Sequence, residues 1–218
     1  MKLLKSLKEK NIREFIIILY IVGIIGSALP FTRDFFILLT PFVLLISFTI
    51  LLAFHSSGFN VKIISVLILI FILSFAVEVA GVKTGIIFGR YFYGKGLGLK
   101  VLETPLIIGL NWVLLVYCTA AIFEKASTGR IIRISGASLL MLAYDFIMEQ
   151  VAPVMDMWSF EGGTAPVRNY MSWLILSILF HSLISITGIK IVNRFAPLVF
   201  FCQLIFFIVL LLLFKIIL

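Results

Sequence analysis

The sequence is poor in charge. Of its 218 residues only 18 are Lys or Arg and 10 are Asp or Glu, whereas 62% are apolar and the mean hydropathy is +1.23. This composition lies outside the range of soluble domains and is typical of polytopic membrane proteins. The net charge of +8 does not indicate a nucleic-acid partner, because the cations flank apolar segments, where they anchor helices and set their orientation.

Cysteine and histidine are equally scarce. Cys118 and Cys202 both lie inside apolar runs, so neither a disulfide framework nor a metal cluster with short ligand spacing is available. The two histidines are not paired as metal ligands, and we interpret His181 as a hydrogen-bonded core residue and His55 as an interfacial one. We therefore expect neither a metal ion nor an organic cofactor.

Long apolar segments, by contrast, are abundant. About 20 apolar residues cross the hydrocarbon core of a bilayer, and suitable segments lie at 12–31, 35–54, 61–81, 104–123, 132–152, 170–189 and 195–217. We predict an all-α, polytopic transmembrane helix bundle of about seven spans, forming a single domain over residues 1–218. The basic and then apolar start resembles a secretory signal, but we interpret it as a retained first span, because many further spans follow.

An odd number of spans places the two termini on opposite faces, so that Lys and Arg can be counted by side. Eleven lie on the amino-terminal side and seven on the other, which favours a cytoplasmic amino terminus in a multi-pass protein of the cell membrane. The two longer connectors, 82–103 and 153–169, are separated by two spans. They must therefore share a face in either orientation.

Carboxyl groups fall inside the predicted spans. Only 11 uncharged residues separate Arg133 from Asp145, which is about 16 Å of helix and half of the hydrocarbon thickness. Asp145, and with it Glu149 one turn later on the same helix face, therefore lies below the membrane surface. By the same count Glu78, 15 uncharged residues after Lys62, is predicted at the membrane edge.

An ionisable side chain at membrane depth costs at least ~2.5 kcal/mol on insertion scales and marks a functional site by default. The alternative is that Asp145 or Glu149 pairs with Arg168 or caps a broken helix. On the sixth span polar and aromatic side chains follow at intervals of four: Asn169, Trp173, Ser177 and His181. We expect the polar stripes of spans three, five and six to converge beneath the two long connectors.

The third connector is rich in glycine and aromatic residues, "GVKTGIIFGRYFYGKGLG". It follows a membrane helix and matches neither nucleotide-binding fingerprint, so phosphate binding is not expected. The composition is suited to an interfacial loop or re-entrant segment whose backbone bends tightly while its rings lie at headgroup depth. A purely structural aromatic belt is the alternative.

Buried carboxyl groups among apolar walls suit one kind of chemistry on a lipid-soluble substrate. A carboxyl group removed from water favours its protonated form, and two close together can share one proton. Such an acid can protonate an alkene. Aromatic faces can stabilise the resulting carbocation, and a second carboxylate can orient the water that captures it.

The string "EVAGVKTGIIFGRYFYGKGLG" followed by "ETPLIIGLNW" resembles the hallmark of integral-membrane carotenoid biosynthesis proteins of the acyclic carotenoid hydratase type. In the second half, "YDFIMEQVAPVMDMWSF" and "APVRNYMSW" resemble the acidic fifth helix of that family, its tryptophan-rich loop and the start of its next helix. The resemblance covers about residues 74–175. The sequence departs from the family pattern at Gln150, Phe160 and Arg168.

The resemblance implies an enzyme that adds water to the terminal C=C bond of a linear carotenoid, without a cofactor. Its partners would be the lipid bilayer and other enzymes of the carotenoid pathway. Asp145 with Glu149 would supply the proton, and Glu78 or Asp156 would position water. The substrate-binding residues implied are Thr84, Arg90, Tyr91, Tyr93, Trp112, Trp158, Asn169 and Trp173. Carotene cyclisation or isomerisation, proton-coupled transport and non-catalytic carotenoid binding remain alternatives.

Overall fold

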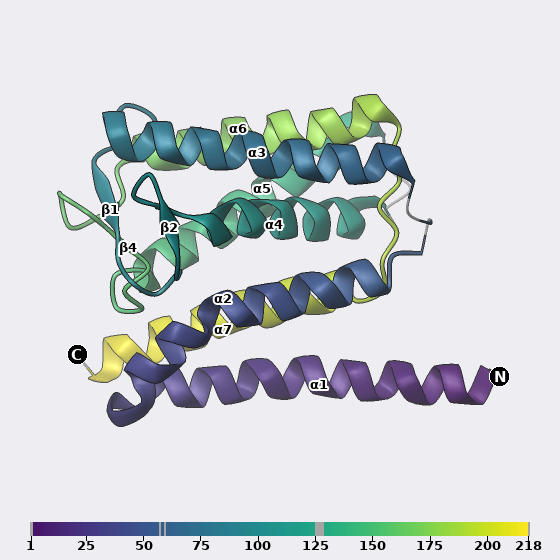
Figure 1. Cartoon of the computed structure of the whole chain (residues 1–218), viewed down its shortest axis with the longest axis horizontal. Coiled ribbons are helices and arrows are strands. Elements are labelled where there is room, and N and C mark those ends of the chain that lie inside the picture. Colours follow the sequence, from purple (N-terminus) through teal and green to yellow (C-terminus); the bar gives the residue numbers. More distant parts are fainter. Residues whose placement is uncertain (1, 57, 59, 125–128, 218) are drawn as a thin grey trace.

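A bundle of seven helices makes up most of the chain (Figure 1). The computed structural model describes residues 2–56, 58, 60–124 and 129–217, with side chains from 9 to 216. The helices are α1 (Lys2–Ala28), α2 (Pro30–Ala53), α3 (Val61–Thr84), α4 (Leu106–Glu124), α5 (Arg130–Val151), α6 (Val167–Thr187) and α7 (Ala196–Ile217). All seven are long and apolar enough to cross a membrane. The predicted all-α, multi-pass architecture is confirmed.

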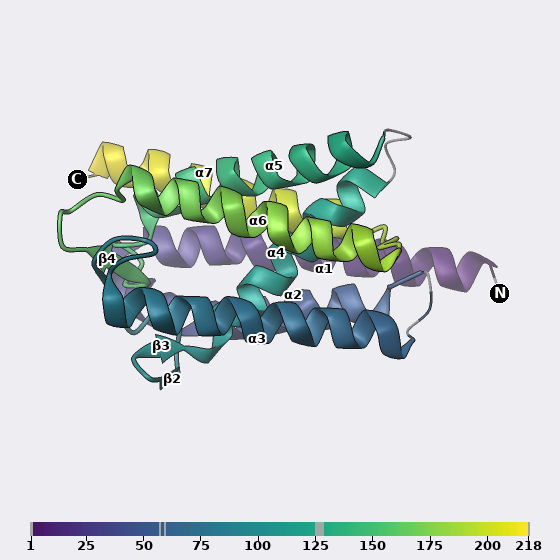
Figure 2. The same ribbon diagram turned by 90° about the horizontal axis from the view of Figure 1, so that it is seen from above.

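Helix α4 lies at the centre of the bundle. It packs against α3, α5 and α6 on one side and against α2 and α7 on the other, and 12 of its 19 residues are buried. Helix α1 packs outside α2 and α7, as Figure 1 shows along the lower edge of the molecule. The view from above in Figure 2 shows α3 and α6 running side by side along the bundle.

The predicted boundary between the first two spans is wrong. We predicted spans at 12–31 and 35–54 with a connector between them, but α1 ends at Ala28 and α2 begins at Pro30, so that only Leu29 lies between them. Proline is favoured in the first helical turn, where its missing N–H costs no hydrogen bond. Thr32 and Arg33 then hydrogen-bond back to carbonyl groups at the end of α1, which holds the tight corner.

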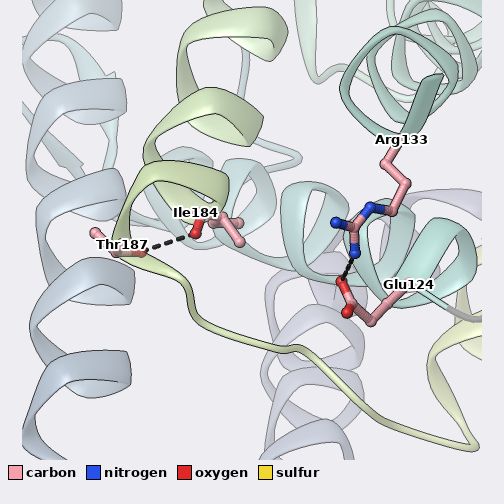
Figure 3. A network of polar contacts seen from close by, with 4 residues as sticks. All are labelled: Glu124, Arg133, Ile184 and Thr187. Atoms are coloured by element: carbon pink, nitrogen blue, oxygen red, sulfur yellow. Dashed lines mark hydrogen bonds and ion pairs between the residues drawn. The ribbon is translucent and has the colours of Figure 1, made fainter. Parts of the chain in front are cut away.

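At the end of the bundle that carries the amino terminus, an ion pair joins α4 to α5. Arg133 Nη1 donates to Glu124 Oε2 at 3.0 Å (Figure 3). In the same view Thr187 Oγ1 donates to the Ile184 carbonyl and closes the last turn of α6. These contacts lie at the end opposite the two long connectors.

The two long connectors pair with each other at the other end of the bundle. Strand β1 (Tyr91–Tyr93) of the third connector runs antiparallel to β4 (Trp158–Phe160) of the fifth, while β2 (Lys100–Val101) and β3 (Thr104–Pro105) form a second small pair. This confirms that both connectors share a face. Because side chains alternate along a strand, Tyr91 and Tyr93 point into the protein and Phe92 points out.

Candidate active site

Glu78 is buried at the carboxyl-terminal end of α3 and accepts hydrogen bonds from three side chains. The hydroxyls of Tyr91 and Tyr93 donate to Oε2, each at 2.7 Å, and Trp112 Nε1 donates to Oε1 at 2.9 Å. The position at the membrane edge predicted for Glu78 left it open to water, but only 4% of it is exposed. The helix continues to Thr84, and the third connector folds back over its end.

The two tyrosines act as fixed donors to this carboxylate. They are two residues apart on β1, so both hydroxyls reach the same oxygen. Burial, and then the nearby Glu78 carboxylate, raise the pKa of Tyr91 and the pKa of Tyr93 above the ordinary value of a phenol. Both hydroxyls therefore keep their protons and donate them in hydrogen bonds.

A second polar group joins α5 and α6 through Asn169. The side-chain amide of Asn169 donates to Glu149 Oε1 at 2.9 Å and to Asp145 Oδ2 at 3.3 Å. Trp158 Nε1 on β4 donates to Glu149 Oε2 at 2.8 Å. Asp145 is fully buried, and its Oδ1 has no hydrogen-bond partner among the described residues.

No cation compensates these three carboxyl groups within the part of the chain that the structure describes. The ion pairs found there all lie elsewhere. Arg168, the alternative partner for Asp145 or Glu149, instead donates from Nη1 to the carbonyls of Gly85 and Ile86. That alternative is wrong for this structure. Burying a charge without a cation is costly unless hydrogen-bond donors surround it. Glu78 has three donors, whereas Asp145 has only the Asn169 amide among the described residues, so the protonated form is favoured most at Asp145.

Aromatic side chains enclose a small cavity next to Glu78. Its volume is about 10 Å³, and its walls are Glu78, Phe88, Tyr91, Tyr93, Ile108, Trp158, Phe160, Asn169 and Trp173. Behind the wall Trp112 stacks on Trp173, with ring centroids 4.0 Å apart. A cavity needs roughly 10–15 Å³ by this measure to hold one water molecule, so this cavity has room for about one water molecule, and a carotenoid chain end enters only when its aromatic walls move apart.

The structure gathers most of the residues predicted for the site. Those that line the cavity or hydrogen-bond to its lining are Glu78, Tyr91, Tyr93, Trp112, Asp145, Glu149, Trp158, Asn169 and Trp173. Three lie apart from it. Thr84 bonds to the Ala80 carbonyl, exposed Arg90 pairs with Glu161, and exposed Asp156 accepts from the backbone N–H of Lys95.

Three lining residues were not among the predicted site residues: Phe88, Ile108 and Phe160. Phe88 belongs to the glycine and aromatic motif, which was a signal for it. Phe160 faces Tyr91 across the β1–β4 pair, a contact that no spacing in the sequence reveals. Among the described residues, no group of three or more His, Cys, Asp or Glu side chains is arranged to hold a metal ion.

Two glycines let the connectors lie close together over the cavity. A Cβ atom on Gly94 would stand 2.1 Å from Asp156 Oδ1, and one on Gly96 would stand 2.4 Å from the Met155 carbonyl oxygen. Gly96 N–H also donates to the Asp156 carbonyl at 2.8 Å. The third connector therefore seats against the fifth at positions where any side chain would push them apart.

Gly96→Ala is expected to weaken the packing of the third connector against the fifth and to lower both the thermal midpoint and the activity. The new methyl group meets backbone, which cannot swing aside, and overpacking of this kind costs about 1–3 kcal/mol. Gly162→Ala is the matched control, because nothing lies within 4 Å of its Cβ position. Thermal scans of the purified variants measure the difference. Equal midpoints for Gly96→Ala and Gly162→Ala would contradict close packing of the two connectors at Gly96.

A family model described as carotenoid biosynthesis protein matches residues 36–218. The chain belongs to this carotenoid biosynthesis protein family. The match includes α3 to α7 and both connectors, and hence every residue of the site. No curated protein and no solved structure matches the chain.

Membership of the carotenoid biosynthesis family gives the protein a role in making carotenoids. The family match begins within α2 and leaves α1 outside it. Family membership identifies the pathway, carotenoid biosynthesis. The chemical step is inferred from the groups that surround the cavity.

Proposed function

We propose that this protein hydrates the terminal C=C bond of a linear carotenoid. The observation that carries the proposal is the group of three buried carboxyls, Glu78, Asp145 and Glu149, without a cation among the described residues and beside a cavity walled by aromatic rings. A carotenoid offers no charged group for such a site to bind. It offers an electron-rich double bond, which an acid can protonate.

Asp145 is the proton donor in this proposal. It does not line the cavity itself but contacts Asn169, which does, so the terminal alkene reaches it past that side chain. As a neutral acid Asp145 carries a proton that no described acceptor engages at Oδ1, while its other oxygen is held by Asn169. The proton moves to the less substituted carbon of the terminal alkene, and the electron pair of the double bond forms the new C–H bond. Asp145 becomes a carboxylate, and its Asn169 contact, shared with Glu149, steadies the charge.

The tertiary carbocation that remains lies among aromatic faces. Tyr91, Tyr93, Trp158 and Trp173 line the cavity, and a cation over an aromatic face is stabilised by roughly 2 kcal/mol where water is excluded. Tyr91 and Tyr93 direct their hydroxyls to Glu78. This arrangement delays proton loss or rearrangement until water arrives.

Glu78 directs the water that captures the cation. It is the one of the three carboxyls that lines the cavity, and three donors on it suit its anionic form. Water bonds through oxygen to the cationic carbon, and the proton that it loses passes to Glu78 and then back to the Asp145 carboxylate. The sum is alkene plus water to tertiary alcohol, with both carboxyls restored and no cofactor consumed.

The proposal is tested by expressing the chain in a bacterium that makes a linear carotene such as lycopene. Pigments that gain the mass of one or two waters are expected. A product isomeric with the carotene would instead identify cyclisation. Unchanged carotene, with the protein present in the membrane, would contradict hydration of this substrate.

A further inference from the structure

A larger cavity lies on the other side of α4 and α5. It has a volume of about 220 Å³ and lies between α1, α2 and α7 and the pair α4 and α5. Its lining is mainly apolar and includes Val43, Leu44, Tyr144, Met148 and Phe206. Figure 1 shows the helices of the two layers that border it. A mainly apolar lining with a few polar groups is typical of a ligand site, and none of the residues placed in the reaction lines it.

The lining of the larger cavity and the candidate active site are neighbours in the chain at four places. Residues that line the larger cavity are followed in the chain by residues of the candidate active site, in the pairs Asn111 and Trp112, Tyr144 and Asp145, Met148 and Glu149, and Met157 and Trp158. Consecutive helical residues point in different directions. The larger cavity is therefore separate from the carboxyl cluster but adjacent to it.

A buried polar group in the lining of this apolar cavity lacks a partner among the described residues. Gln203 of α7 lines it and is 3% exposed, and its Oε1 makes no hydrogen bond with any described residue. A buried acceptor without a donor is unfavourable. A hydroxyl group both donates and accepts, so it can pair with either end of the glutamine amide. A bound ligand that carries a hydroxyl would relieve the cost.

The larger cavity reaches the lipid-facing surface. Val22 on α1 belongs to its lining and is 48% exposed on the outside of the bundle. Apolar side chains surround it there, including Ile18, Ile21 and Ile25. A ligand can thus arrive from the bilayer without crossing water.

We propose that this cavity is a second ligand site, which binds a linear isoprenoid chain bearing a hydroxyl group, with the hydroxyl on Gln203. A hydrated chain end has this chemistry, but the site is inferred from its own lining and does not depend on the proposed reaction. Binding is measured without turnover. Its failure and the failure of hydration are therefore distinguishable.

The test uses purified protein in lipid nanodiscs and a photoreactive derivative of geranylgeraniol, a linear isoprenoid alcohol. Labelled peptides are mapped by mass spectrometry, and unlabelled geranylgeraniol competes against the corresponding hydrocarbon. Labels are expected on α2 near Val43 and on α7 near Phe206. The alcohol should compete about fivefold to tenfold better than the hydrocarbon, the worth of one hydrogen bond.

Two variants make the test specific. Gln203→Leu should abolish the advantage of the alcohol without lowering the thermal midpoint, because it removes a group that has no partner. Gly23→Leu should abolish the labelling, because a Cβ atom there meets only the Phe206 ring at 3.4 Å and the rest of the side chain fills the cavity. Labels confined to outer helix faces, or equal competition by alcohol and hydrocarbon in the unaltered protein, would overturn the proposal.

Discussion

Asp145→Asn is expected to lower turnover at least about a hundredfold while the protein remains folded in the membrane. General acid catalysis contributes about 10²–10⁴ to a rate, and asparagine cannot donate a proton to an alkene. The fold should tolerate the change, because the asparagine side chain keeps an oxygen for the Asn169 amide. Conversion of a linear carotene by purified protein in vesicles measures the rate.

Asp34→Asn is the matched control. Asp34 is exposed in α2 and lies outside the site, so this variant should keep the rate of the unaltered protein. If Asp145→Asn also kept that rate, with the Asp34 control behaving as expected, Asp145 would be removed from the mechanism.

Glu78→Gln is expected to reduce both activity and stability. The Glu78 carboxylate accepts three hydrogen bonds, but a glutamine amide turns an NH₂ group towards donors on one side. Hydrogen bonds to a charged acceptor contribute about 1.5–3 kcal/mol, so a loss of about 2 kcal/mol is expected. The thermal midpoint of the purified variant should fall by several degrees, and turnover should fall with it.

Glu161→Gln provides the comparison for that loss. Glu161 pairs with Arg90 at the surface, where both side chains are well exposed, and such pairs contribute about 0–1 kcal/mol. Its midpoint should stay close to that of the unaltered protein. If the midpoint of Glu78→Gln also stayed close to that of the unaltered protein, the three hydrogen bonds to Glu78 would not require a carboxylate.

The helices were predictable from the sequence because a bilayer demands long apolar segments. Segments 61–81 and 132–152 differ from α3 and α5 by three residues or fewer at either end. The tight corner before Pro30 was not predicted, since a stretch with Arg33 and Asp34 reads as a polar connector. Hydropathy reports composition, and it cannot distinguish a connector from the first turn of a helix.

The carboxyl cluster was partly predictable. The separation of Asp145 from Arg133 placed it at membrane depth, and the shared face of the long connectors placed Glu78 and Asn169 beneath them. The burial of Glu78 was not predictable, because it depends on Tyr91 and Tyr93 folding back from β1. Asp156 matched the family motif, but its carboxylate bonds to a backbone N–H of the connector. Sequence spacing cannot distinguish a carboxylate that positions water from one that accepts a hydrogen bond from the backbone.

The most direct measurement of the central claim is the origin of the oxygen in the product. Purified protein in lipid vesicles is given a linear carotene in oxygen-18 water under ordinary air, and the pigment is analysed by mass spectrometry. Hydration predicts that every new hydroxyl carries the heavy isotope and that Asp145→Asn forms at least about a hundredfold less of this product in the same time. A hydroxyl without the label, or an isomeric product without oxygen, would contradict hydration at this site.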